Sequence, residues 1–226
     1  MGIPRLAAAA LLLCALQAAR AIEVPAIGGS RFTIPIASMK QMRFKMTLRQ
    51  QFDFSCGSAA VATLLTHQYG FPVSEAFVFE QMYANGDQAK ILKEGFSLLD
   101  MKRFLASQGF TADGFKLPLH KLIDAKLPAI VLVAEKGYHH FVVIKGAADG
   151  RVLLGDPASG TRSLTLDGFE AIWSGKLLFV IHGAAPHPAF NLLSDWRAAP
   201  HAPLETAINR DGISALTIPK LGPGDY

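Results

Sequence analysis

A single cysteine at the head of an alanine-rich apolar segment constrains this chain more than any other feature. Within residues 49–70 (RQQFDFSCGSAAVATLLTHQYG), Cys56 is followed by small and apolar residues at helical spacing, and Gly70 stands where a helix-ending glycine belongs. The pattern predicts a buried helix with Cys56 in its first turn, where the helix dipole and unpaired N–H groups favour a thiolate. Two interpretations remain open here: an activated nucleophile, and a small buried cysteine that packs like alanine.

Residues 1–21 fit a secretory signal. Arg5 supplies a positive start, residues 6–16 form an apolar run, and Ala19-Arg20-Ala21 fits an A-x-A cleavage site. The run is too short to span a bilayer comfortably, and no later apolar stretch reaches about 18 unbroken residues. We therefore expect a periplasmic protein, with secretion as the alternative, and no transmembrane segment in the mature chain.

Loss of the signal would change the charge and the cysteine count. The formal net charge falls from +4 to +2 because Arg5 and Arg20 are removed, which argues against a nucleic-acid partner. Loss of Cys14 leaves Cys56 unpaired, and exported proteins usually pair their cysteines or have none. An unpaired thiol is therefore expected to be buried or used. One cysteine and scattered histidines make a poor metal-ligand set, so we expect no metal and no cofactor.

The sequence divides into four parts. After the signal, residues 22–42 are expected to be an irregular segment, because Pro25, Gly28-Gly29 and Pro35 interrupt it. Residues 43–183 carry the periodic patterns of a folded domain. Residues 184–226 form a proline-rich tail that we expect to be largely unstructured, apart from one docked helical turn at residues 192–196.

Within the domain, the period of the apolar residues changes halfway along. Residues 43–50 alternate as in a half-buried strand. Helices are expected near 56–69, 75–83 with Ser74 as N-cap, 97–107 with a capping box, and 119–125, with a loop or short helix at 86–95. Strands are expected near 111–116, 129–134, 140–146, 151–155, 161–165 and 176–181, with a helical turn at 169–173. Helices followed by an antiparallel sheet predict an α+β domain.

Polar residues mark two strand ends in the second half. His139 and His140 open one expected strand, Asp156 ends the next, and Asp149-Gly150 between them is a hairpin turn signal. The start of one strand and the end of its antiparallel partner lie at the same sheet edge, so a histidine and Asp156 can be neighbours. A carboxylate there would fix the imidazole tautomer, and a thiolate beside the imidazole would complete a Cys–His–Asp arrangement. A strand-end histidine bonded to backbone and a turn-forming Asp-Pro are the structural alternatives.

An oxyanion donor is also needed for such chemistry. Gln50 and Gln51 both precede Cys56, and the side-chain amide of either could act with the Cys56 backbone N–H. The residues alone do not choose between them.

These motifs resemble those of the C39 cysteine peptidases, the papain-like domains that remove double-glycine leaders from bacteriocins and peptide pheromones. The match covers about residues 46–181. It consists of a Gln six residues before Cys-Gly and an alanine-rich helix, a His followed by Phe-Val-Val, and an Asp-Pro after the next strand. The resemblance implies a papain-like fold with Gln50 in the oxyanion hole, Cys56 as nucleophile, His140 as acid and base, and Asp156 as orienting residue.

The resemblance also implies a substrate class. Family members cut after double glycine, so a protein or peptide with a small-residue cleavage site is the expected partner. The best-known members are fused to a transporter, whereas this chain has none and carries an export signal. Stand-alone exported members, among them one encoded with a functional amyloid secretion system, are similar in length and layout, so a secretion-system component is a further expected partner. A non-catalytic peptide-binding module and another papain-like amidase are the alternatives.

Overall fold

The computed structural model describes residues 21–25, 31–35, 38–183 and 187–199. The expected signal, apart from its last residue, and the tail from residue 200 onward lie outside these ranges. The chain forms two units, Met1–Gln41 and Met42–Tyr226. Among the described helices, none is long and apolar enough to cross a membrane.

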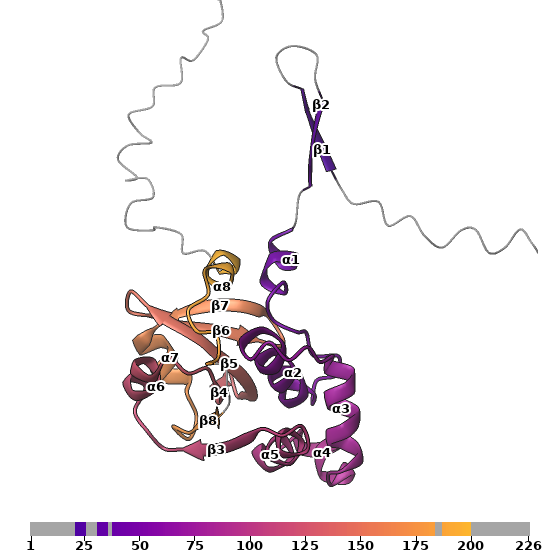
Figure 1. The fold of residues 1–226 in the computed structure, drawn as a ribbon, viewed down its shortest axis with the longest axis vertical. Helices are drawn as coiled ribbons and strands as arrows, with labels where there is room; N and C mark the ends of the chain where they lie inside the picture. The colour runs from indigo at the N-terminus through magenta and orange to yellow at the C-terminus, as the bar shows by residue number, and fades with distance from the viewer. Residues whose placement is uncertain (1–20, 26–30, 36–37, 184–186, 200–226) are drawn as a thin grey trace, which may run out of the picture. The chain divides into compact units, whose positions relative to one another are not determined.

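The first unit contains an antiparallel hairpin of β1 (Ala21–Pro25) and β2 (Arg31–Pro35), with Glu23 opposite Thr33 (Figure 1). The irregular backbone expected for residues 22–42 is therefore wrong for nine of these ten residues, since Ala21 precedes that segment. Each proline stands at the last position of its strand, where a missing N–H is tolerated, and the residues before it are mostly β-branched or aromatic. The short helix α1 (Met39–Arg43) follows.

The second unit is built on one six-stranded antiparallel sheet with the order β3-β8-β4-β5-β6-β7. Its strands are β3 (Thr111–Phe115), β4 (Ala129–Glu135), β5 (Tyr138–Ala148), β6 (Arg151–Asp156), β7 (Gly160–Thr165) and β8 (Leu178–His182). The β5–β6 turn has positive φ at both Asp149 (50°) and Gly150 (69°), as the expected two-residue hairpin requires. The antiparallel sheet, together with the helices described below, confirms the α+β class predicted from the sequence.

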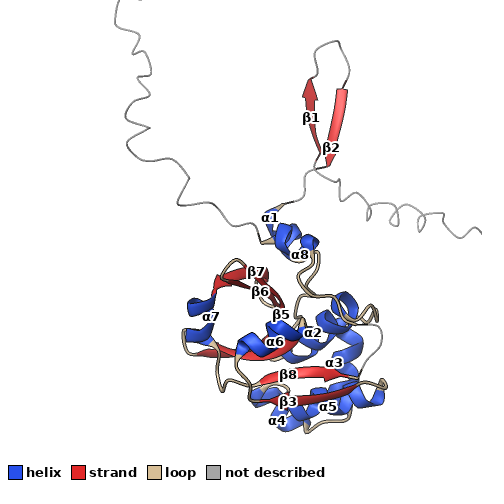
Figure 2. Ribbon diagram, turned by 60° about the vertical axis from the view of Figure 1, so that its left-hand side comes forward, coloured by secondary structure: helices blue, strands red, loops and turns tan. Residues whose placement is uncertain are grey.

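Helices cover both faces of the sheet (Figure 2). The α2, α3, α4 and α5 side chains pack on one face against Ile130, Val143 and Phe179, and α6 and α7 pack on the other against Val131 and Val142. The helices are α2 (Cys56–Thr63), η1 (Leu64–Gln68, a π-helical turn), α3 (Glu75–Ala84), α4 (Gln88–Glu94), α5 (Leu98–Ser107), α6 (Leu119–Ala125) and α7 (Leu166–Ile172).

Local signals in the sequence account for several of these boundaries. The Ser74 side chain accepts the Phe77 N–H at the start of α3, and Ser97 and Asp100 form the expected capping box of α5. Gly70, with φ of 65°, follows η1 as the expected helix-ending glycine. The helix that carries Cys56 thus ends where predicted, although its second half is π-helical.

The strand expected at residues 43–50 does not form. This segment has no sheet partner, and side chains or single backbone groups bind its polar atoms instead: Thr63 Oγ1 accepts the Leu48 N–H at 2.9 Å, and Lys145 Nζ donates to the Met46 carbonyl. The alternating pattern placed Thr47 on the polar, exposed face. Thr47 is instead fully buried, and its hydroxyl lies 2.7 Å from that of Thr161. Arg43 ends α1, and residues 44–47 form a turn and bends that are held by the domain interior.

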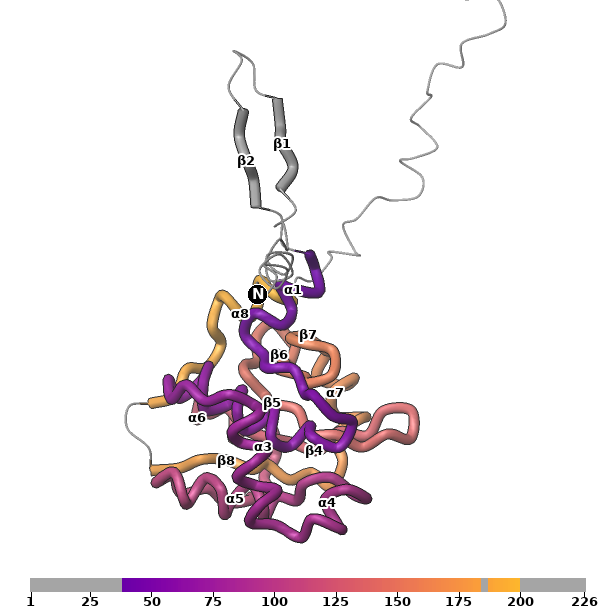
Figure 3. Tube along the Cα trace, turned by 90° about the vertical axis from the view of Figure 1, so that its right-hand side faces the viewer, coloured from indigo at the N-terminus to yellow at the C-terminus, as the bar shows by residue number. Residues whose placement is uncertain are grey.

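Residues 187–199, which follow β8, dock more deeply than the sequence indicated. Figure 3 follows the trace from β8 to the short helix α8 (Leu193–Ala198). Asp195 of α8 is fully buried and pairs with the fully buried Lys145 of β5 at 2.5 Å. Of the three residues expected to dock, Leu193 is instead 64 % exposed, whereas Leu192 and Trp196 are half-buried. A buried ion pair, which the sequence did not indicate, also attaches this helix.

Candidate active site

Cys56 is the first residue of α2, and every residue of that helix is buried. The preceding turn is closed by Ser55, whose hydroxyl donates to the Phe52 carbonyl at 3.0 Å and accepts the Phe52 N–H at 3.1 Å. The neighbour Gly57 is required by packing, because a Cβ there would lie 2.8 Å from Met101 Cε and 3.0 Å from Phe96 Cβ. The turn and this close packing hold Cys56 at a fixed place at the helix start.

The electrostatics of the thiol differ from the sequence-based expectation. Burial raises the pKa of Cys56, and the backbone amides of Phe141, Gly57 and Cys56 itself lower it only in part. The charge of Asp156 raises it slightly further. The helix start alone therefore does not produce a thiolate, because Cys56 is only 7 % exposed. A cation beside the thiol is needed, and the residue before Phe141 is His140.

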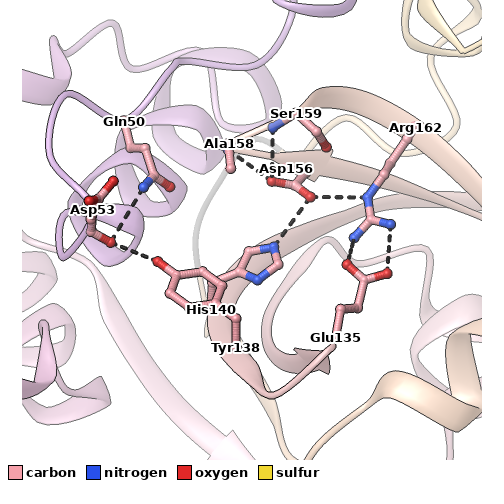
Figure 4. A network of polar contacts seen from close by, with 9 residues as sticks. All are labelled: Gln50, Asp53, Glu135, Tyr138, His140, Asp156, Ala158, Ser159 and Arg162. Carbon is pink, nitrogen blue, oxygen red and sulfur yellow. Dashed lines mark hydrogen bonds and ion pairs between the residues drawn. The ribbon is translucent and has the colours of Figure 1, made fainter.

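His140 lies near the start of β5 and is buried, whereas His139 is exposed. Its Nε2 atom is 3.2 Å from Asp156 Oδ2, a contact drawn in Figure 4. Its Nδ1 atom is buried and has no hydrogen-bond partner among the described residues. The hairpin at Asp149-Gly150 thus joins the strand ends as the sequence indicated, and leaves one imidazole nitrogen for another group.

Asp156 ends β6 and is held from two sides. Its Oδ1 atom accepts the backbone N–H groups of Ala158 at 2.8 Å and Ser159 at 3.2 Å, while its Oδ2 atom faces His140 and Arg162. Burial pushes the pKa of this carboxyl upward, but the hydrogen bonds and the positive charges of His140 and Arg162 outweigh burial and hold the pKa well below its usual range. Asp156 is therefore a carboxylate at any pH at which the protein would work.

Gln50 lies beside this group, although its amide faces its own loop. Its backbone N–H donates to the Pro157 carbonyl at 3.1 Å, which places the residue next to the Asp156 turn. The side-chain Nε2 donates to the carbonyls of Phe52 at 3.0 Å and Asp53 at 3.4 Å. Gln51 is exposed. Of the two glutamines, Gln50 is the one that the structure brings to the site.

Three residues that the sequence analysis did not single out complete the surroundings. The Tyr138 ring stacks on the His140 ring at 5.5 Å, and its hydroxyl donates to the Asp53 carbonyl at 2.8 Å. Arg162 binds both Asp156 and Glu135 (Figure 4). Tyr138 could have been noticed from its position two residues before His140, on the same face of a strand. Arg162 and Glu135 carried no sequence signal, because their contacts depend on the order of the strands.

The same group contains the one set of possible metal ligands found among the described residues. Ligand atoms of Glu135, His140 and Asp156 lie within 4.8 Å of one another. Both carboxylates, however, are bound to the Arg162 guanidinium, which already supplies a positive charge between them. The donor set is therefore engaged in an ion network, and we assign no metal to it.

A thiol at a helix start, bound by the amide of the residue that follows the histidine of an imidazole–carboxylate pair, fits an arrangement for covalent attack on a carbonyl. With a helical layer carrying the cysteine and an antiparallel sheet carrying the histidine and aspartate, fold and site define the papain-like cysteine peptidase class.

Comparison with known proteins narrows this class. The model of the Peptidase C39 family matches residues 44–185. The probable functional amyloid protease FapD of Pseudomonas fluorescens is 40 % identical over 166 residues, which cover 74 % of this chain and 73 % of that protein. The chain belongs to the peptidase C39 family and is a cysteine peptidase.

Two solved structures share the fold. The peptidase domain of Streptococcus ComA, a bifunctional ABC transporter involved in quorum sensing, is 25 % identical with a TM-score of 0.51, over 60 % of this chain and 96 % of that domain. A double-glycine-motif protease from an AMS/PCAT transporter, solved in complex with the leader peptide, is 22 % identical with a TM-score of 0.50, over 60 % of this chain and 89 % of that one. The papain-like fold expected from the sequence is confirmed.

Proposed function

We propose that this chain is an exported cysteine peptidase that cleaves a secreted or periplasmic protein after small residues, with Cys56 as nucleophile, His140 as acid and base, and Asp156 as orienting residue. One observation carries the assignment. His140 binds Asp156 through Nε2 and has a buried, unpartnered Nδ1, while the next residue, Phe141, presents its amide to the Cys56 thiol. The free nitrogen is the one available to take the thiol proton.

The reaction then proceeds in two stages. The Cys56 thiolate, formed by proton transfer to His140, attacks the carbonyl carbon of the residue before the cut. The C–N bond breaks as the imidazolium gives its proton to the leaving amine, which leaves a thioester on Cys56. Water then attacks the thioester, His140 accepts a proton from that water, and the thiol is released with a new carboxyl terminus.

Stabilisation of the developing oxyanion is assigned to the Cys56 backbone N–H and Gln50. In the structure the Gln50 amide donates to the carbonyls of its own loop. We therefore infer that the amide turns toward the substrate carbonyl when substrate binds. Catalytic hydrogen bonds are often long or poorly aligned in unliganded enzymes and form fully only in the complex.

The substrate proposal rests on relatives and on the chain's beginning. One similar structure holds a leader peptide in a double-glycine-motif protease, and the most similar relative described above is named for functional amyloid. Residues 1–21 fit an export signal. We propose an exported protein of a functional amyloid or biofilm secretion system as substrate, cut after a Gly-Gly-like pair.

The test is incubation of the purified protein with exported proteins of its source organism and with synthetic Gly-Gly peptides. Cleavage sites are read by mass spectrometry, with Cys56→Ala as the inactive control. Cysteine-dependent cleavage after small residues supports the proposal. Peptide binding without cleavage would instead identify a non-catalytic binding module and overturn it.

A further inference from the structure

The ion network behind Asp156 extends the site beyond the predicted residues. We propose that Glu135 and Arg162 are positioning residues for the His140–Asp156 pair: Arg162 fixes the Asp156 carboxylate, and Glu135 cancels the charge that Arg162 brings toward the imidazole. The inference rests on the proposed peptidase function for its kinetic consequence, whereas its electrostatic consequence can be measured without substrate.

Arg162 holds the carboxylate oxygen that faces the histidine. Its Nε atom donates to Asp156 Oδ2 at 3.0 Å, and His140 Nε2 approaches this same oxygen at 3.2 Å. The turn after β6 binds only the other oxygen, Oδ1. Without Arg162, rotation of the carboxylate about its Cβ–Cγ bond would be restrained from one side alone.

Glu135 in turn fixes the guanidinium. Its two oxygens accept from Arg162 Nη1 at 3.0 Å and Nη2 at 2.6 Å, a bidentate pair with planar geometry. Glu135 is the last residue of β4, and Arg162 lies on β7, so the pair connects strands on both sides of the strands that carry His140 and Asp156. The Glu135 carboxylate thus binds the Arg162 guanidinium, which binds the Asp156 carboxylate, which in turn contacts the His140 imidazole.

The charges in this network do not cancel. Asp156 contributes one negative charge beside His140, but Arg162 alone would cancel it. The hydrogen bonds from Arg162, opposed by partial burial, lower the pKa of Glu135 and keep it ionised. The three groups together retain one negative charge. Within the part of the chain that the structure describes, Cys56 from α2 and Tyr138 from β5 also interact electrostatically with Asp156, and Asp53 interacts with Tyr138.

A role in stability alone does not explain the arrangement. The side chains of Arg162 and Glu135 are partly exposed (21 % and 33 %), so their ion pair with each other contributes little, with a typical range of about 0–1 kcal/mol for exposed pairs, whereas Asp156 is only 4 % exposed. The contact is instead directed at a buried oxygen that touches the imidazole. We therefore expect these substitutions to change turnover and histidine titration more than they change unfolding.

Kinetics give the first readout. Arg162→Met should lower kcat by about a hundredfold with KM nearly unchanged, because the carboxylate and imidazole lose their orientation. Arg162→Lys should recover part of this loss, since one donor can still reach Asp156. Glu170→Gln, which breaks the exposed Lys176–Glu170 ion pair at 2.5 Å, is the matched control and should leave kcat within twofold.

NMR titration of the His140 imidazole, in a Cys56→Ala background, gives the second readout and needs no substrate. Glu135→Gln should move the titration midpoint down relative to the parent protein, because an uncancelled guanidinium then opposes the imidazolium. Arg162→Met should not move it down, since two carboxylates remain. The double variant should return toward the parent value, because both opposing charges are gone.

These outcomes separate the two proposals. If Glu135→Gln and Arg162→Met leave both the titration and kcat within error of the Glu170→Gln control, the positioning role is wrong. If the titration shifts as stated while the unsubstituted protein cleaves no peptide, the network stands and the peptidase proposal fails. Thermal unfolding of each variant identifies a folding defect, and the Arg162→Lys rescue then decides the positioning role.

Discussion

All four groups that contact the Asp156 carboxylate can donate hydrogen bonds, and His140 is one of them, with its Nε2 atom 3.2 Å from Asp156 Oδ2. Oδ2 contacts His140 and Arg162, and Oδ1 accepts hydrogen bonds from two backbone N–H groups. The site therefore requires two acceptor oxygens at this position.

An asparagine at this position cannot satisfy both sides. Whichever way the amide is turned in Asp156→Asn, its NH2 group faces donors, so either the bond to His140 or the turn at Ala158 is lost. We expect kcat/KM for this variant to fall about tenfold or more, and that of Asp156→Ala to fall further. Steady-state kinetics on a cleaved peptide measures both. Equal loss in the two variants would show that the negative charge, and not the orientation, is what matters.

Acid should weaken the fold through the same carboxyl. The pKa of Asp156 in the folded protein lies well below its ordinary value of 3.8, so its contribution to stability is fully present above 3.8 and is lost progressively as the pH falls from 3.8 toward the folded pKa. Between pH 5 and pH 3 the expected part of this loss is about 1 kcal/mol. Urea unfolding at about pH 5 and pH 3 measures it, and Asp156→Asn should lose correspondingly less between these pH values. Identical pH dependence in the two proteins would contradict the lowered pKa.

Reactivity of Cys56 should depend on His140. Because burial raises the pKa of the thiol, its thiolate at neutral pH must come from an ion pair with the imidazole. His140→Ala should therefore slow iodoacetamide labelling of Cys56 at pH about 7 by more than tenfold. His139→Ala is the matched control, since that side chain is exposed, and it should label at the parent rate. Fast labelling in His140→Ala would exclude the ion pair.

The sequence predicted most elements because their signals are local. Ser74, Ser97 and Gly70 act within one turn of the chain, and the Asp149-Gly150 turn determines which strand ends meet. That turn also brings His140 to Asp156, so this half of the site could be reasoned out before the structure was known.

The features that the sequence did not predict depend on contacts between residues far apart in the chain. The segment at 43–50 has a strand-like pattern, but it pairs with neither edge strand of the sheet, β3 or β7. Arg162 and Glu135 meet only because the sheet order is β4-β5-β6-β7, which no local pattern encodes. The burial of Cys56, which reverses the expected shift in its pKa, likewise depends on the packing of the whole helical layer.

The Lys145–Asp195 pair makes α8 part of the domain, beyond the matched family region that ends at residue 185. Both side chains are fully buried, and burial lowers the pKa of Lys145 despite its partner. Asp195→Ala leaves this charge unpaired and should lower the free energy of unfolding by about 3–5 kcal/mol. Urea unfolding measures the change. Lys145→Met combined with Asp195→Leu should recover most of the loss, and failure to recover it would show that the pair also has a structural role that apolar packing cannot replace.

Tyr138 should restrict the residue that precedes the cut. Its ring covers one side of the His140 imidazole, and its hydroxyl bond to Asp53 closes the space between the start of β5 and the loop that carries Gln50. The two residues after the nucleophile, Gly57 and Ser58, are small and buried in α2. A site of this kind selects by steric rejection, which can exceed the ~1–3 kcal/mol gained when an apolar pocket accepts one more methylene.

We therefore expect the parent protein to cleave Gly-Gly peptides at least a hundredfold faster than Gly-Leu peptides in kcat/KM. Tyr138→Ala should reduce this ratio mainly by improving cleavage after leucine, whereas Tyr138→Phe, which keeps the ring, should retain most of it. If the parent protein accepts leucine as well as glycine before the cut, the narrow site is wrong even with the roles of Cys56 and His140 intact.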